Sequence, residues 1–172
     1  MVNTPTIDIR TGFGYDVHRF DDDRSNPKKL LLCGIKIDHP RPLKGHSDAD
    51  VALHAITDAL LGTLGAGDIG EHFPDTDPQW RGANSWLFVE HAMKMLHAEH
   101  GTLNHIDLTI ICQKPRITPY KPQMKQKLMD FLKLTEHHVN VKATTTEKLG
   151  FTGREEGIAV HAVATCIFEP RK

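Results

Sequence analysis

Apolar residues along the chain follow two different periods, and these periods predict strands and helices in a mixed order. Alternating or continuously apolar stretches predict strands over residues 7–18, 106–112, 139–145 and 158–168, with a short hairpin over 30–37. A helical repeat predicts helices from the segment 45–50 to about Leu64, over 83–100, and over about 122–134. This order predicts one α/β (α+β) sandwich domain over residues 1–172, with helices on one face of a mixed sheet of about four strands.

Local signals set the expected boundaries of these elements. Ser47 or Asp48 is predicted to cap the first helix, which should end before Gly65, and Gly101 is predicted to follow the second helix. Residues 68–82 contain Asp, Gly and Pro without periodicity, so we expect a long functional or mobile loop. Residues 1–9 are interpreted as a nonspecific N-terminal extension.

Charge and hydropathy exclude several broad classes of function. The chain has 21 Lys and Arg against 22 Asp and Glu, a formal charge of −1, without the basic excess typical of proteins that bind nucleic acid or anionic membranes. No apolar run approaches the roughly 20 residues of a membrane helix, and no secretory signal is visible at the N-terminus. We therefore expect a soluble intracellular protein with no nucleic-acid or membrane partner.

Histidine is abundant, with 12 residues, and one set of three side chains has the composition of a metal site. Asp16 and His18 are two residues apart on a predicted strand, so both side chains leave the same face, and His54 lies in the middle of a predicted helix. One carboxylate and two imidazoles with an open fourth position are typical of catalytic zinc. Asp50 or Asp58, one turn to either side, is expected to accept the second ring N–H of His54, with Asp58 preferred. The same spacing also fits ordinary structural residues.

Two further polar segments have both a chemical and a structural interpretation. His46, Ser47, Asp48 and Asp50 crowd a helix start, which indicates anion binding or simple capping. Thr144–Thr146 with Glu147 end a predicted strand and suit a phosphate with a hard cation such as Mg²⁺, although threonines are common in strands. Arg154 suits either a phosphate or a structural ion pair.

Four motifs together cover nearly the whole chain, from about Arg10 to Phe168. They are GFGYDVH at 12–18, HSDADVALHAITDALLG at 46–62, GDIG at 67–70 with FPDTD at 73–77, and VKATTTEKLGFTGR at 141–154. In content and order they resemble the 2-C-methyl-D-erythritol 2,4-cyclodiphosphate synthase family. The resemblance implies a homotrimer with active sites between subunits, located in the bacterial cytoplasm, which is favoured, or, after processing, in a plastid. The length favours the stand-alone enzyme. Ala49 stands where the family usually has Gly, and we expect Ala to favour the helix start.

The resemblance also implies roles for individual residues. It assigns Zn²⁺ to Asp16, His18 and His54, and a second ion, Mg²⁺ or Mn²⁺, to Glu147. It assigns catalysis to His46, Asp58, Thr145 and Glu147. Substrate binding falls to His46, Ser47, Asp68, Ile69, Gly70, Phe73 and Asp75. Cytidine binding falls to Cys112, Pro115, Arg116, Ile117, Ala143, Thr144 and Thr145. Phe151 and Arg154 match a phosphate site or the central cavity of the trimer.

The implied reaction converts 4-diphosphocytidyl-2-C-methyl-D-erythritol 2-phosphate into the cyclic diphosphate and releases CMP, in non-mevalonate isoprenoid synthesis. Two alternatives stay open at this point. A metal-dependent phosphodiesterase or pyrophosphatase would use the same ligands to activate water, and the spacing of the residues alone favours it. A zinc-stabilised protein that binds a cytidine nucleotide without turnover is the second.

Overall fold

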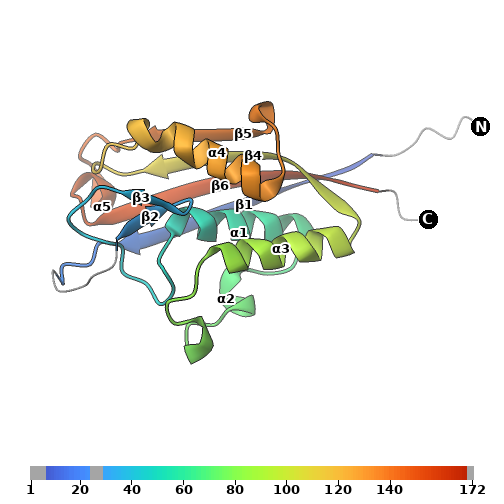
Figure 1. The fold of residues 1–172 in the computed structure, drawn as a ribbon, viewed down its shortest axis with the longest axis horizontal. Helices are drawn as coiled ribbons and strands as arrows, with labels where there is room; N and C mark the ends of the chain where they lie inside the picture. Colours follow the sequence, from blue (N-terminus) through green and yellow to red (C-terminus); the bar gives the residue numbers. More distant parts are fainter. Residues whose placement is uncertain (1–6, 24–28, 170–172) are drawn as a thin grey trace, which may run out of the picture.

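The computed structural model describes residues 7–23 and 29–169 and contains a four-stranded sheet with helices packed on one side (Figure 1). The strands β1 (Asp8–Arg19), β6 (Gly157–Phe168), β4 (Gly101–Ile111) and β5 (Val139–Thr144) lie in the order β1-β6-β4-β5. Strand β6 runs antiparallel to β1 and β4, whereas β4 and β5 are parallel, so the sheet is mixed as predicted. The predicted hairpin is also present, as β2 (Leu30–Leu32) and β3 (Ile35–Ile37).

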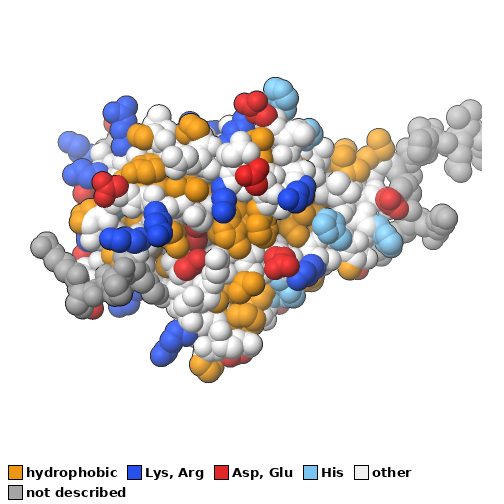
Figure 2. Space-filling model, in the orientation of Figure 1, with side chains coloured by type: hydrophobic (Ala, Val, Ile, Leu, Met, Phe, Trp, Pro, Cys, Tyr) orange, Lys and Arg blue, Asp and Glu red, His pale blue; other side chains and the backbone are white. Residues whose placement is uncertain are grey.

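Three long helices match the three predicted from the apolar repeat. They are α1 (Val51–Leu64), α3 (Trp86–Ala98) and α4 (Lys121–Leu132). Helix α1 packs mainly against β1 and β6, α4 packs against β5, and α3 packs against α1 and β4. Between α3 and α4, apolar side chains gather on the helical face of the molecule (Figure 2), where the rings of Trp86 and Phe131 lie 4.1 Å apart.

The two faces of β1 differ in composition because alternate residues point to opposite sides of a strand. Gly12 and Gly14 face α1 so closely that a Cβ on either would lie 1.9 Å from a backbone oxygen of that helix. The intervening Phe13 and Tyr15 are 58% and 47% exposed on the other face of the sheet. Their neighbours across the register are Val163 and His161 of β6. The sheet therefore has one face covered by helices and one face with exposed aromatic residues.

The start of α1 differs from the prediction. Neither Ser47 nor Asp48 caps the helix; Asp50 does, by accepting the N–H of Leu53 at 3.1 Å. The Asp50 carboxylate also accepts the N–H groups of Cys33 and Gly34, so one buried side chain joins α1 to the β2–β3 turn. Ala49 precedes the helix with a φ of 61°, and the expectation that Ala favours the helix start is wrong because this left-handed backbone favours Gly.

Other boundaries also shift. Helix α3 ends at Ala98, and Gly101, predicted to follow the helix directly, opens β4 five residues before the predicted start of that strand. The predicted loop over 68–82 contains a one-turn helix, α2 (Ile69–His72), and the loop between β5 and β6 contains α5 (Gly150–Gly153). Of the predicted extension 1–9, Asp8 and Ile9 belong to β1, and residues 1–6 lie outside the described part of the chain. Within the described ranges, no helix has the length and apolar character needed to cross a bilayer.

The contact between β1 and α1 predicts a large effect of one added methyl group. In Gly14→Ala the new Cβ would lie 1.9 Å from the carbonyl oxygen of Ala55, so the helix must move, and we expect a loss of about 3 kcal/mol in the free energy of unfolding.

The control variant is Gly65→Ala at the end of α1, where φ is 63° and a Cβ would meet no atom within 4 Å. Only backbone strain of about 1 kcal/mol is expected there. Urea unfolding of both variants measures the difference, and equal losses would contradict a role for the β1–α1 contact.

Candidate functional site

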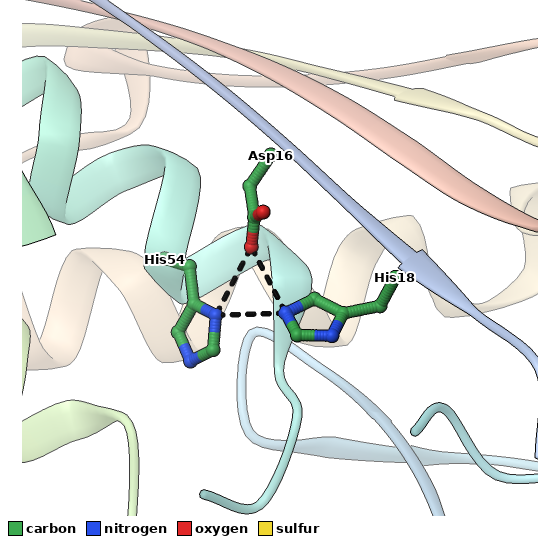
Figure 3. A group of neighbouring side chains, drawn as sticks. All are labelled: Asp16, His18 and His54. Carbon is green, nitrogen blue, oxygen red and sulfur yellow. Dashed lines mark hydrogen bonds and ion pairs between the residues drawn. The ribbon is translucent and has the colours of Figure 1, made fainter. Parts of the chain in front are cut away.

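Asp16, His18 and His54 converge at the C-terminal part of β1 (Figure 3). Asp16 and His18 come from β1, and His54 comes from the first turn of α1. Oδ2 of Asp16 lies 3.1 Å from Nε2 of His18 and 3.0 Å from Nδ1 of His54, and these two nitrogens lie 3.0 Å apart. The predicted ligand set is therefore assembled in the folded chain.

The chemistry of these groups fits a bound cation. Nδ1 of His18 lies 2.8 Å from the carbonyl oxygen of Lys44, which can only accept, so His18 directs the lone pair of Nε2 at the other two ligand atoms. Burial alone would raise the pKa of Asp16, but the neighbouring imidazoles of His18 and His54 outweigh it and lower that pKa well below its usual range. Ligand atoms of a tetrahedral Zn²⁺ with bonds of 2.0–2.1 Å lie about 3.3 Å apart, close to the spacing seen here.

The partner predicted for the second ring nitrogen of His54 is wrong. Asp50 is occupied by backbone N–H groups at the start of α1, and Asp58 accepts the N–H of Ile69 at 2.7 Å. Nε2 of His54 instead faces two hydroxyl groups, Ser85 Oγ at 2.9 Å and Ser47 Oγ at 3.2 Å. Hydroxyls from two other parts of the chain thus replace the expected carboxylate.

A cavity of about 660 Å³ opens above the three ligand side chains. It is lined by Asp16, His18, Gly45, His46, Ser47, His54, Ile69, Gly70, Phe73, Pro74, Asp75, Thr76, Trp80 and Phe88. Nε2 of His46 and Nε1 of Trp80 are buried and have no hydrogen-bond partner among the described residues. Unpaired buried nitrogens beside a cluster of metal-ligating groups indicate a site for a polar ligand.

Six of the seven residues predicted to bind substrate line this cavity, and the seventh, Asp68, supports its wall. Asp68 caps α2 by accepting the N–H of Glu71, and Asp58 holds the same short helix through Ile69. Burial, the largest influence, raises the pKa of Asp58. The loop is fixed to α3 by aromatic packing, because the ring of Phe73 lies 4.5 Å from Phe88 and 5.0 Å from Trp80.

The residues predicted to bind cytidine line a second cavity, of about 430 Å³, between the ends of β4 and β5. All seven contribute, together with Gln113 and Thr118: Cys112, Pro115, Arg116, Ile117, Ala143, Thr144 and Thr145. Because β1 and β5 are opposite edges of the sheet, this cavity and the candidate metal-binding cluster lie toward opposite edges.

Glu147 lies in the turn after β5 and not with the other predicted metal ligands. Thr145 donates its hydroxyl to Oε1 of Glu147 at 2.9 Å and accepts the Glu147 N–H at 3.3 Å. Glu147 and Lys148 have φ values of 53° and 66°, a left-handed pair that is costly for residues other than Gly. Backbone strain of this kind is typical of functional turns.

Phe151 and Arg154 both line a third hollow, of about 530 Å³. Arg154 donates to Glu156 at 2.8 Å, so its guanidinium already has one acidic partner within the chain. This hollow is lined by residues of β1, the α5 region and Arg41, away from the three metal-ligating side chains.

Several residues at the site were not assigned from the sequence. Pro74, Thr76, Trp80, Phe88 and Gly45 line the main cavity. Pro74 and Thr76 lie inside the quoted FPDTD motif, which was a usable signal, whereas Trp80 and Phe88 gave none beyond an apolar pattern. Ser85, which contacts His54, has the position of an ordinary helix cap.

The three-ligand cluster predicts metal binding that depends on each of its members. We expect His18→Ala to lower the affinity for Zn²⁺ at least ~100-fold, because one of three ligands is lost. Competition with a chromophoric chelator measures this affinity. His97→Ala on α3, outside the cluster, should retain wild-type affinity, and equal binding by both variants would contradict the assignment.

Comparison with known proteins finds similar chains. The chain is 55% identical over 161 residues to the bifunctional enzyme IspD/IspF of Bartonella bacilliformis, covering 94% of this chain and 40% of that enzyme. It resembles the structure of bifunctional IspDF from Campylobacter jejuni with a TM-score of 0.88 and 43% identity, covering 96% of this chain and 44% of the other. The chain thus spans about two fifths of the length of these relatives.

A third comparison covers a whole protein. A solved 2C-methyl-D-erythritol-2,4-cyclodiphosphate synthase with CDP bound matches with a TM-score of 0.80 and 35% identity, over 90% of this chain and 98% of that one. Residues 9–167 match the YgbB family as a whole. This match includes all the predicted site residues and all of the four strands except Asp8 and Phe168, and the chain belongs to the YgbB family.

Proposed function

We propose that this chain catalyses the cyclisation of 4-diphosphocytidyl-2-C-methyl-D-erythritol 2-phosphate to 2-C-methyl-D-erythritol 2,4-cyclodiphosphate, with release of CMP. The observation that carries the proposal is the convergence of Asp16, His18 and His54 on the floor of the 660 Å³ cavity. Family membership and the likeness to a synthase that binds CDP support it.

The reaction needs one new bond and one broken bond, both at the same phosphorus atom. An oxygen of the 2-phosphate attacks the β-phosphorus, and the bond from that phosphorus to the oxygen bridging it to the α-phosphorus breaks. The bridging oxygen leaves with its electron pair on CMP. Because the attacking oxygen is already an anion, no nucleophilic side chain is needed, in agreement with a site rich in metal ligands.

Two metal ions would bind the phosphates of the substrate. Asp16, His18 and His54 would hold Zn²⁺, and Glu147, positioned by Thr145, would hold Mg²⁺ or Mn²⁺. Such ions neutralise charge on the attacking and leaving oxygens. His46 and Ser47 face the same cavity and would bind the substrate phosphates.

The rest of the substrate would bind to groups outside the metal ligands. The loop from Asp68 to Asp75, fixed by Asp58 and the aromatic packing of Phe73, would hold the methylerythritol. The cavity between β4 and β5 would hold the cytidine group of the substrate.

A homotrimer would bring these two half-sites together. Within one chain they lie at opposite edges of the sheet, and Glu147 is not part of the metal-ligating cluster. The uncovered face of the sheet exposes large apolar side chains, including Ile9 at 60% and Phe13 at 58%, which suits burial against other copies. Phe151 and Arg154 would then lie toward a cavity between subunits.

The proposed activity predicts a specific product. We expect ³¹P NMR of the purified protein with Zn²⁺, Mg²⁺ and the diphosphocytidyl substrate to show two coupled signals of a cyclic diphosphate together with CMP. Asp16→Ala should abolish turnover because a metal ligand is lost. CMP with a linear bisphosphate would instead identify a hydrolase, and bound but unchanged substrate would identify a non-catalytic binding protein.

Sites shared between subunits predict that two inactive variants restore each other. We call the half-site of Asp16, His18 and His54 the metal half, and the half-site of Glu147 with the cavity between β4 and β5 the nucleotide half. His18→Ala should inactivate the metal half, and Glu147→Gln should inactivate the nucleotide half. In trimers formed at random from equal amounts of both, about a quarter of the interfaces pair two intact halves, so we expect about a quarter of wild-type activity. Mixed trimers that remain inactive would show that each chain completes its own site.

A further inference from the structure

The ring nitrogen of His54 that points away from Asp16 and His18 contacts a serine at the start of another helix. Nε2 of His54 lies 2.9 Å from Oγ of Ser85, and both side chains are buried. Ser85 precedes α3, so this contact joins the first turn of α3 to the first turn of α1. The opposite ring nitrogen, Nδ1, is the one that faces Asp16 and His18.

Ser85 stands at the capping position of α3 but does not cap it. Its hydroxyl makes no hydrogen bond to the N–H groups of the first turn, although serine at this position ordinarily stabilises a helix. The neighbouring Asn84 provides a cap instead, by accepting the N–H of Trp86 at 3.0 Å. The Ser85 hydroxyl is therefore free for another role.

A carboxylate holds this hydroxyl in place. Oδ2 of Asp48 accepts the backbone N–H of Ser85 at 3.1 Å, and Oδ1 of Asp48 accepts its hydroxyl. Asp48 is fixed in turn, because its backbone N–H donates to the carbonyl of Ala83 at 3.0 Å and its Oδ1 accepts the N–H of Asp50. Hydrogen bonds therefore join the segment at Asp48 to the segment 83–85 and fix the position of the Ser85 hydroxyl.

The direction of these hydrogen bonds determines where the proton of His54 lies. An ionised carboxylate can only accept, so the Ser85 hydroxyl donates to Asp48 and offers its lone pairs to His54. A ring hydrogen on Nε2 of His54 satisfies these lone pairs, and in this tautomer Nδ1 presents its own lone pair to a metal ion held with Asp16 and His18. The Lys44 carbonyl fixes His18 in the complementary tautomer, with Nε2 free.

We propose that Asp48 and Ser85 are positioning residues of the metal site, which fix the tautomer and the orientation of His54 so that Nδ1 is available as a ligand. This inference rests on the proposed metal-dependent function, and it adds two residues that touch neither the metal nor the substrate. Partners of this kind commonly change metal affinity by about 10–100-fold.

Zinc affinity and the His54 tautomer test this proposal. We expect Ser85→Ala to bind Zn²⁺ about 10–100-fold more weakly, and Ser85→Thr, which keeps the hydroxyl, to restore most of the affinity. In the metal-free protein at alkaline pH, ¹⁵N NMR should show His54 with its hydrogen on Nε2 in the wild type and a mixture of tautomers in Ser85→Ala and in Asp48→Asn.

Asn84→Ala is the matched control, because it removes the cap of α3 next to Ser85 without touching His54. It should lower the Tm of the metal-free protein and leave zinc affinity unchanged. Equal zinc affinity in Ser85→Ala and wild type, or an unchanged tautomer, would overturn the positioning role. Absence of zinc binding in the wild type would instead overturn the proposed function, while the tautomer measurement would still decide the role of Ser85.

Discussion

The close packing of α1 against β1 is the constraint on which the site depends. Gly12 and Gly14 allow the backbones of the two elements to touch, since any side chain there would collide with the carbonyl oxygens of Ala59 or Ala55. That distance sets how far His54 lies from Asp16. Two residues without functional groups therefore control the geometry of a cluster whose ligand atoms lie about 3 Å apart. The geometry of the ligand atoms at Asp16 is thus a consequence of packing at Gly14 and Gly12, two and four residues before it in β1.

The four long strands and the three long helices could be predicted from the sequence because their apolar spacing extends over several periods. The hairpin was predicted from two short apolar runs on either side of Gly34. The two one-turn helices could not be predicted, because four residues such as Ile69–His72 are too few to show a period. Their positions come from tertiary contacts, such as the Asp58 carboxylate on the N–H of Ile69. The left-handed backbone conformation of Ala49 could not be predicted from the sequence either, since Ala ordinarily favours a right-handed helix.

The Asp16–His18 part of the candidate metal cluster could be predicted because its geometry is local, whereas the partner of His54 could not because it depends on distant contacts. Asp16 and His18 share a strand face, and that relation is fixed by the period of two in a strand. The partner of His54 is not local. Asp58, one turn away, looked suitable, but its carboxylate is used by the loop, and the contact comes from Ser85, 31 residues further along the chain. Nothing in the sequence separates such a serine from a helix cap, because both stand at the same position.

Both halves of the proposed active site are preformed, although by different means. The metal half is built from buried side chains with backbone and hydroxyl partners. The nucleotide half contains a strained turn at Glu147 and Lys148, which packing against Gly153 holds in place, since a Cβ there would lie 2.2 Å from the backbone of Lys148. Rigid halves leave little protein freedom to be lost when substrate binds, and positioning of the reacting groups can supply roughly 7–11 kcal/mol of a barrier. Catalysis would then depend mainly on the relative placement of two rigid surfaces, which assembly of subunits into the proposed homotrimer would fix before substrate binds.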